Sequence, residues 1–233
     1  MGRIVAISGG NLLTTRPLNK YAIKLSKKQN PRVLFIGTAS HDAQEYIHTF
    51  TNEYEKLGCE VKILCLCSEC TDKEVDELLA WADIIYVGGG DTVFMMKVWK
   101  KRGLNEKLKK IYQKDTAVLT GISAGAICWF NCGHSDSGFF EKDDKWKFCW
   151  ADGMLDLIHM AFCPHYNNEQ RRSSFDEMMK EKNMVGLAME EDTAFVSDNG
   201  KQYFIKSDVN ANAFVLEYKN QMIKKTKVEF SVL

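Results

Sequence analysis

One serine, Ser123, stands in the middle of a glycine-framed segment, Gly121-Ile122-Ser123-Ala124-Gly125. A β-favouring run of residues 116–120 precedes it, and an apolar, helix-compatible run of residues 126–130 follows it. G-x-S-x-G on a strand-to-helix turn is the pattern of a nucleophile elbow, where small neighbours leave the serine hydroxyl accessible. The same segment also fits a plain turn whose serine only caps a helix. Residues elsewhere in the chain must decide between the two.

A second glycine turn, Gly88-Gly89-Gly90, follows the apolar run of residues 84–87. Glycines let backbone N–H groups approach an oxygen closely, so Gly89 or Gly90 could donate to an oxyanion together with the N–H of Ala124. A phosphate cradle or an ordinary turn is the alternative. The chain has no P-loop Lys-Ser/Thr motif and no G-x-G-x-x-G in its first strand–helix unit, so acyl chemistry ranks above nucleotide binding.

A base for this serine must come from five histidines: His41, His48, His134, His159 and His165. His165 follows the strand-like run of residues 157–162, and Pro164 stiffens the turn between them. A histidine at the carboxyl end of a strand can face a serine in the same sheet, so we assign His165 as the general base. His134 is the rival. We expect His41 and His48 on the surface and His159 as a half-buried structural residue.

The third member of a catalytic triad is an acid that orients the imidazole. Carboxylates cluster at Glu190-Glu191-Asp192, directly after the strand-like run of residues 185–189. Clusters of acidic residues are also common in ordinary turns without a catalytic role. Asp136, in a polar segment upstream, is a competitor for the same role.

Composition limits the classes of function. The 233 residues are 45% hydrophobic and 27% charged, with 31 basic and 31 acidic residues, which gives no electrostatic case for nucleic acid or anionic lipid. No secretory signal or membrane-length apolar run is evident, which predicts a cytoplasmic protein that does not enter a membrane. The eight cysteines predict reduced thiols. Cys65, Cys67 and Cys70 lack a second ligand pair, so we expect no metal and no cofactor.

The positions of these residues depend on alternating strand and helix signals. Apolar runs and turn residues predict strands over residues 3–7, 32–38, 59–67, 84–87 and 116–120, and helices over 17–28, 43–57, 72–82 and 93–113, the last broken near Gly103. Thr71-Asp72-Lys73-Glu74 is a capping box, and Gly58 ends the second helix. We predict one domain, residues 1–233, with a doubly wound, mostly parallel sheet covered by helices on both faces.

Four motifs in this order carry a resemblance: Val87-Gly88-Gly89-Gly90-Asp91-Thr92, Gly121-Ile122-Ser123-Ala124-Gly125-Ala126, Pro164-His165-Tyr166 and Glu191-Asp192-Thr193-Ala194. Together they resemble peptidase family S51, the dipeptidase E and cyanophycinase family of serine peptidases, whose fold is similar to that of class I glutamine amidotransferases. The resemblance implies that Ser123 is the nucleophile, His165 the base and Glu191 the orienting acid, with Asp136 as the alternative acid.

The resemblance also implies a small peptide substrate, a dipeptide or isopeptide with an aspartyl residue. Arg171 and Arg172 could bind its carboxylate through a bidentate fork, although adjacent arginines at a helix start are more often surface charges. Two stretches depart from the family pattern. The aromatic and charged residues 139–150 could form a lid, a rim or an interface, and residues 202–206, 213–218 and 222–228 predict β-hairpins that extend the sheet. We expect a monomer or a homodimer.

Two other classes of function stay open. An α/β-hydrolase-type esterase also uses G-x-S-x-G but places its histidine last, so Asp143, Asp144, Asp152 or Asp156 would precede His165 as the acid. A non-catalytic binding protein would use Ser123 only as a helix cap. A glutaminase ranks lower because such enzymes have a cysteine at the position of Ser123.

Overall fold

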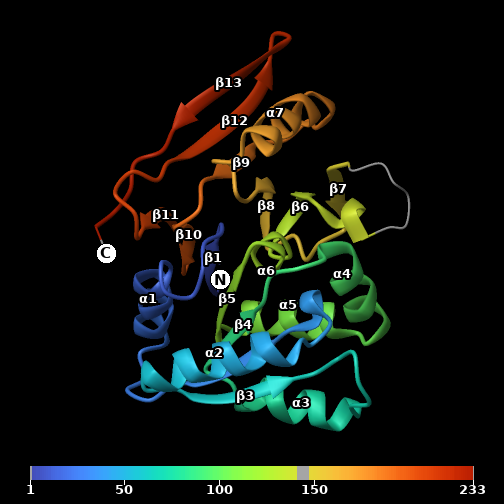
Figure 1. Cartoon of the computed structure of the whole chain (residues 1–233), viewed down its shortest axis with the longest axis vertical. Coiled ribbons are helices and arrows are strands. Elements are labelled where there is room, and N and C mark those ends of the chain that lie inside the picture. Colours follow the sequence, from blue (N-terminus) through green and yellow to red (C-terminus); the bar gives the residue numbers. More distant parts are fainter. Residues whose placement is uncertain (1, 141–146, 233) are drawn as a thin grey trace.

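A computed structural model describes residues 2–140 and 147–232. Two β-sheets lie one beside the other in the fold, with helices packed on both (Figure 1). The first sheet has seven strands in the order β11-β10-β1-β5-β4-β2-β3, and the second has six in the order β13-β12-β9-β8-β6-β7. The sequence predicted a mixed α/β fold with mostly parallel strands, which is confirmed, but it predicted one extended sheet and not two.

The first sheet has a parallel centre and an antiparallel edge. Strands β1, β5, β4, β2 and β3 run parallel to one another, and β10 and β11 add an antiparallel hairpin beside β1. The bounds are β1 Arg3–Ile7, β2 Arg32–Ile36, β3 Glu60–Leu64, β4 Ile84–Val87, β5 Val118–Ile122, β10 Thr193–Asp198 and β11 Lys201–Lys206. The strand order places the ends of β1, β5 and β4 side by side, which is where parallel sheets bind ligands.

Helices cover both faces of this sheet. Apolar side chains of α1 and α2 pack on one face with Phe35 and Tyr86, and those of α3, α4 and α5 pack on the other with Leu34 and Ile85. The helix bounds are α1 Arg16–Ser26, α2 Gln44–Lys56, α3 Asp72–Trp81, α4 Thr92–Lys101, α5 Leu104–Lys114, α6 Ala124–Ile127 and α7 Glu169–Met178, with short 3-10 turns η1 Thr38–Ser40, η2 Ser137–Phe140 and η3 Met179–Glu181. Thr71 and Glu74 form the predicted capping box at the start of α3. Gly58, with φ 83, lies just after the end of α2, as predicted.

The second sheet contains the strand that leads to His165. Its central strands β6, β8 and β9 are parallel, and β7, β12 and β13 pair antiparallel at its edges. The bounds are β6 Phe130–Ser135, β7 Cys149–Asp152, β8 Ile158–Cys163, β9 Gly186–Met189, β12 Ala213–Lys219 and β13 Met222–Lys227. Our expectation that His165 and Ser123 follow strands of the same sheet was therefore wrong, because β8 and β5 belong to different sheets.

The two sheets share one hydrophobic core. A single buried cluster contains Leu119 of β5 and Trp99 of α4 together with Phe130, Phe162 and Leu187 of the second sheet. A smaller cluster beneath α7 covers the other face of the second sheet. Because a common core fixes the sheets against each other, loops from both can contribute to one site.

Three segments differ from the expectations or extend them. The helix after Ser123 is only one turn long, because the apolar run continues as strand β6. The C-terminal hairpins extend both sheets, β10–β11 the first and β12–β13 the second. Residues 141–146 of the predicted 139–150 insert lie outside the described residues, while β7 forms the end of that stretch.

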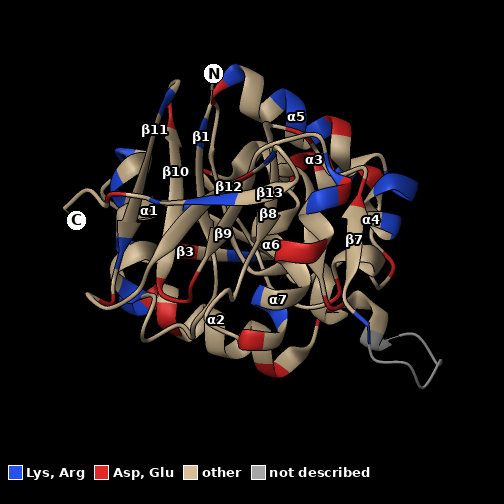
Figure 2. Cartoon of the chain, turned by 90° about the horizontal axis from the view of Figure 1, so that it is seen from above, with Lys and Arg blue, Asp and Glu red and all other residues tan. Residues whose placement is uncertain are grey.

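Acidic and basic residues are interspersed along the helices and strands (Figure 2), as their equal numbers suggest. No helix within the described ranges has the length and apolar character needed to cross a membrane.

Candidate active site

Ser123 sits on a strained turn between β5 and α6. Its backbone has φ 54 and ψ −115, a conformation that an L-residue adopts only when its surroundings impose it. Its N–H donates to the carbonyl of Ile7 at 3.0 Å, which ties the turn to the end of β1. A Cβ on Gly125 would lie 2.1 Å from the carbonyl oxygen of Val87, so only glycine permits the close approach of this turn to β4. The local geometry is that of a nucleophile elbow.

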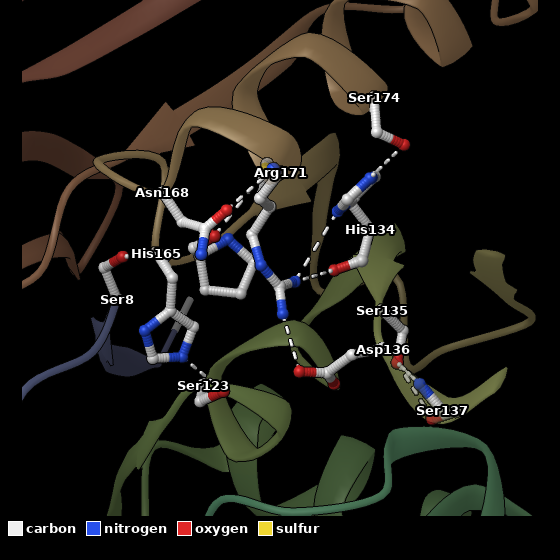
Figure 3. Close-up of polar contacts among 12 residues, drawn as sticks. Ser8, Ser123, His134, Ser135, Asp136, Ser137, His165, Asn168, Arg171 and Ser174 are labelled. Carbon is white, nitrogen blue, oxygen red and sulfur yellow. Dashed lines mark hydrogen bonds and ion pairs between the residues drawn. The ribbon is translucent and has the colours of Figure 1, made fainter. Parts of the chain in front are cut away.

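The hydroxyl of Ser123 points toward His165 and not toward its own helix. The serine makes no side-chain cap hydrogen bond. Its Oγ lies 2.9 Å from Nε2 of His165, and Nδ1 of the same ring lies 2.8 Å from Oε1 of Glu191 (Figure 3 shows the serine and the imidazole). With the proton on Nδ1, the imidazole donates to the carboxylate and accepts from the serine hydroxyl, which is the arrangement of a nucleophile, base and orienting acid.

The backbone of His165 is held in the left-handed region, with φ 53. Its N–H donates to the hydroxyl of Ser8 at 3.0 Å, and this hydroxyl donates to the carbonyl of Met189 at 2.6 Å. Ser8 is fully buried, so these bonds lie away from water. It therefore links the end of β1 to the histidine loop and to the end of β9.

Gly9 contacts the imidazole directly. A Cβ at this position would lie 2.4 Å from Nδ1 of His165 and 3.0 Å from Cγ of Glu191. Sequence reasoning did not find the roles of Ser8 and Gly9. The available signal was their place in a small-residue turn after the first strand, at the edge of the sheet where Ser123 also lies.

Glu191 is positioned by its own backbone as well as by the histidine. Its N–H donates to Oδ1 of Asn167 at 3.1 Å, which joins the β9–β10 turn to the loop after His165. The hydrogen bond from the imidazole lowers the pKa of the Glu191 carboxyl, and partial burial opposes that shift. The carboxyl is thereby kept ionised, as an orienting acid requires.

The glycine turn after β4 lies against the serine. A Cβ on Gly89 would be 3.5 Å from Cβ of Ser123, and the Gly89 N–H is 3.4 Å from the hydroxyl of Tyr46, a long contact. The N–H of Ala124 belongs to the first turn of α6, where no intrahelical acceptor exists. Gly90 has φ +138 and packs on the carbonyl of Ala39. Gly89 and Ala124 thus both lie next to Ser123.

Asp136 pairs with Arg171 and not with His165. Its Oδ2 accepts from Nη2 of Arg171 at 2.6 Å, and the same guanidinium donates to the carbonyl of His134 at 3.1 Å (Figure 3). The arginine side chain is only 6% exposed. Its charge is therefore neutralised within the protein, and the carboxylate that is hydrogen-bonded to the imidazole of His165 is that of Glu191.

His134 is a buried structural residue. Its Nε2 lies 3.0 Å from Oγ of Ser174, and its ring packs against Phe148 and Phe175. Burial, reinforced by the nearby charge of Arg171, lowers the pKa of His134 to about 3. This environment keeps the ring neutral, and the ring hydrogen-bonds to Ser174 and not to Ser123.

The remaining candidate residues lie apart from the serine or are engaged elsewhere. Arg172 donates to the carbonyl of Tyr166 and lies 3.8 Å from Glu190. His41 and His48 are exposed, as predicted. The prediction for His159 was wrong, because its side chain is 73% exposed and pairs with Asp156.

The eight cysteines, all of which lie within the described residues, form no disulfide with one another. Burial raises the pKa of the Cys59 thiol to about 11. Among the described residues, no three His, Cys, Asp or Glu side chains are grouped so that they could bind a metal ion.

Comparison with known proteins assigns the family. The model of peptidase family S51 matches residues 4–205. The chain belongs to this family. The resemblance given by the four sequence motifs is therefore confirmed, and the family defines the chain as a peptidase and hydrolase.

Curated relatives of the chain carry the same description. The uncharacterized peptidase YgaJ of Bacillus subtilis (strain 168) is 34% identical over 206 residues, which are 85% of this chain and 85% of the relative. The uncharacterized peptidase Lin0382 of Listeria innocua serovar 6a is 31% identical over 148 residues, 61% of this chain and 68% of the relative. The solved structure of a peptidase from an acI-B1 Actinobacterium is similar in fold, with a TM-score of 0.76 at 17% identity over 100% of this chain and 96% of that one.

Proposed function

We propose that this member of family S51 is a serine peptidase that hydrolyses small peptides through an acyl-enzyme formed on Ser123. The observation that carries the proposal is the continuous set of hydrogen bonds from Ser123 Oγ to His165 and from His165 to Glu191, at 2.9 and 2.8 Å. Family membership supports peptide hydrolysis, and the strained elbow supports a serine held for attack.

The proposed reaction is acyl transfer in two steps. His165 Nε2 takes the proton of Ser123 as Oγ attacks the peptide carbonyl, while Glu191 stabilises the imidazolium. The N–H groups of Ala124 and of Gly89 or Gly90 stabilise the oxyanion, and each such donor contributes about 10²–10³ to kcat. His165 then protonates the leaving amine. Water, deprotonated by the same imidazole, attacks the acyl carbonyl and releases Ser123.

The alternatives have less support. An esterase-type triad needs an acid before His165, but Asp152 pairs with Lys182, Asp156 pairs with His159, and Asp143 and Asp144 lie outside the described residues. A helix-capping serine in a non-catalytic binding protein would bond to its own helix, whereas Ser123 bonds to a base.

The expectation of an aspartyl residue in the substrate depends on a free cation near Ser123, which would bind the carboxylate of that residue. Arg171 and Arg172 were the candidates. The first is committed to Asp136, and the second contacts Glu190 and the carbonyl of Tyr166. Aspartyl peptides therefore belong in the substrate test, but the two arginines give them little support.

The decisive experiment is turnover of a dipeptide panel by purified protein and by Ser123→Ala. The panel contains Asp-Xaa, β-Asp-Xaa, Xaa-Asp and apolar dipeptides, with products quantified by liquid chromatography. We expect hydrolysis that Ser123→Ala abolishes, with its far-ultraviolet circular dichroism unchanged. Ser26→Ala, at the distant end of α1, is the control and should retain full turnover. Equal kcat for Ser123→Ala and the wild type would overturn the proposal.

A further inference from the structure

An apolar groove opens beside the serine, on the face of the first sheet that α1 and α2 cover. It has a volume of about 600 Å³. The loop between β1 and α1 forms one wall, the first turns of α2 form the other, and side chains of β4 and β5 form the floor. The side chains that give the groove its chemistry are those of Leu12, Leu13, Glu45, Tyr46, Tyr86 and Ile122.

The groove is continuous with the proposed catalytic residues. Ile122 immediately precedes Ser123, and its Cγ2 would lie 3.9 Å from a Cβ on Gly89. Tyr46 reaches the same glycine through its hydroxyl. At the other wall, Gly10 follows Gly9, which touches the imidazole of His165. A peptide whose carbonyl carbon faces Ser123 can therefore place a neighbouring side chain in this groove.

The charge of the groove selects against acidic side chains. The described residues that surround it include no Lys, Arg or His, and the one ionisable carboxyl is that of Glu45. A carboxylate placed there would lose water, gain no partner and be repelled by Glu45. An aliphatic or aromatic side chain would instead bury its surface against leucine, tyrosine and isoleucine.

From these observations we propose that the groove is the side-chain subsite of the peptidase and that it selects an apolar residue beside the scissile bond. This inference rests on the proposed function. It differs from the aspartyl preference implied by the family resemblance, because the local chemistry of the groove is apolar. Burying a leucine side chain is expected to raise kcat/KM by roughly 10- to 100-fold over alanine.

The test compares kcat/KM for Leu-Ala, Ala-Leu, Ala-Ala, Asp-Ala and Ala-Asp in the wild type and in Leu13→Arg. Leu13 is 67% exposed on the groove wall, so a replacement there should not disturb folding. We expect the wild type to prefer one of the two leucine peptides at least tenfold over Ala-Ala and over both aspartyl peptides. Leu13→Arg should lower that preference about tenfold and raise hydrolysis of the matching aspartyl peptide. The control Val209→Arg, at an 82% exposed position in the turn before β12, should leave all five values unchanged.

Two outcomes separate the groove from the peptidase activity itself. Ser123-dependent hydrolysis that favours the aspartyl peptides would overturn the groove proposal and leave the peptidase proposal intact. If no peptide is hydrolysed, the peptidase proposal fails. The groove proposal is then tested by calorimetric measurement of peptide binding to the Ser123→Ala protein. Leucine peptides that bind at least tenfold tighter than aspartyl peptides, with the difference reduced by Leu13→Arg, would support it. Equal affinities would overturn it.

Discussion

The hydroxyl of Ser8 accepts a hydrogen bond at 3.0 Å from the backbone N–H of His165, a residue 157 positions later in the chain. Ser8 directly follows strand β1 of the first sheet, whereas His165 follows β8 of the second sheet. Ser123 is also joined to β1, because its N–H donates to the carbonyl of Ile7. The consecutive residues Ile7 and Ser8 thus fix Ser123 and His165 relative to each other.

Ser8→Ala should weaken catalysis without removing any reacting group. The change leaves the N–H of His165 without its partner and removes one of two hydrogen bonds to the carbonyl of Met189, which still accepts from the N–H of Tyr166. The expected cost is about 1–3 kcal/mol of unfolding free energy. The freed histidine backbone should lower kcat about tenfold, with KM nearly unchanged, because geometry affects the transition state most. Steady-state kinetics and urea unfolding measure both effects. Ser26→Ala removes a comparable hydroxyl-to-carbonyl bond in α1 and should leave kcat unaltered.

Gly9→Ala tests the contact between the first turn and the imidazole. The added Cβ would meet Nδ1 of His165 at 2.4 Å, so the ring must move away from Ser123 or Glu191. A displacement of this size should lower kcat by about 10²-fold. For the control Gly103→Ala, no atom lies within 4 Å of the new Cβ, and its φ of 65 predicts a stability cost of about 1 kcal/mol with normal kcat. Full activity of Gly9→Ala would show that the histidine is not held there during turnover.

Replacing the two candidate acids separates their roles. Glu191→Gln removes the charge that orients the imidazole and should lower kcat by about 10²–10⁴-fold, with stability nearly unchanged. Asp136→Asn instead leaves the buried guanidinium of Arg171 without its counter-ion and should cost about 1–3 kcal/mol of stability, between the values for exposed and buried pairs. Kinetics and thermal unfolding of both variants measure this. The opposite pattern, with kcat lost only in Asp136→Asn, would make Asp136 the triad acid.

Much of the site could be predicted from local sequence because its signals are local. The glycines around Ser123 and after β4 reflect close backbone packing, and His165 and Glu191 stand at strand ends, where parallel strands present side chains to a ligand. The division into two sheets could not be read from these signals. Strand periodicity specifies which face of a strand is buried, but not which strand it pairs with.

The contacts of the Arg171 and Arg172 side chains also could not be predicted from the sequence. Arg171 and Arg172 look alike as neighbours at the start of a helix, yet successive helical residues point in different directions. The first side chain turns inward to His134 and Asp136, and the second lies over Tyr166. Ser8 was missed for a similar reason, because a small polar residue in a turn has no pattern that reveals a partner 157 residues away.

His134→Gln should flatten the dependence of stability on pH. Burial holds the pKa of His134 near 3 in the folded protein, below the value of about 6.5 for an unfolded histidine. Between these two values the unfolded chain binds the proton more readily, so folding stability falls as pH decreases from about 6.5 toward 3. The contribution of this residue approaches about 1.4 kcal/mol per pH unit. Glutamine keeps a polar group near Ser174 but does not titrate, so the difference in urea-unfolding free energy between variant and wild type should be constant above pH 7.5. As pH falls to 4.5, this difference in unfolding free energy should shift in favour of the variant. A difference that stays constant over the whole pH range would contradict the assignment of His134 as a histidine buried in its neutral form.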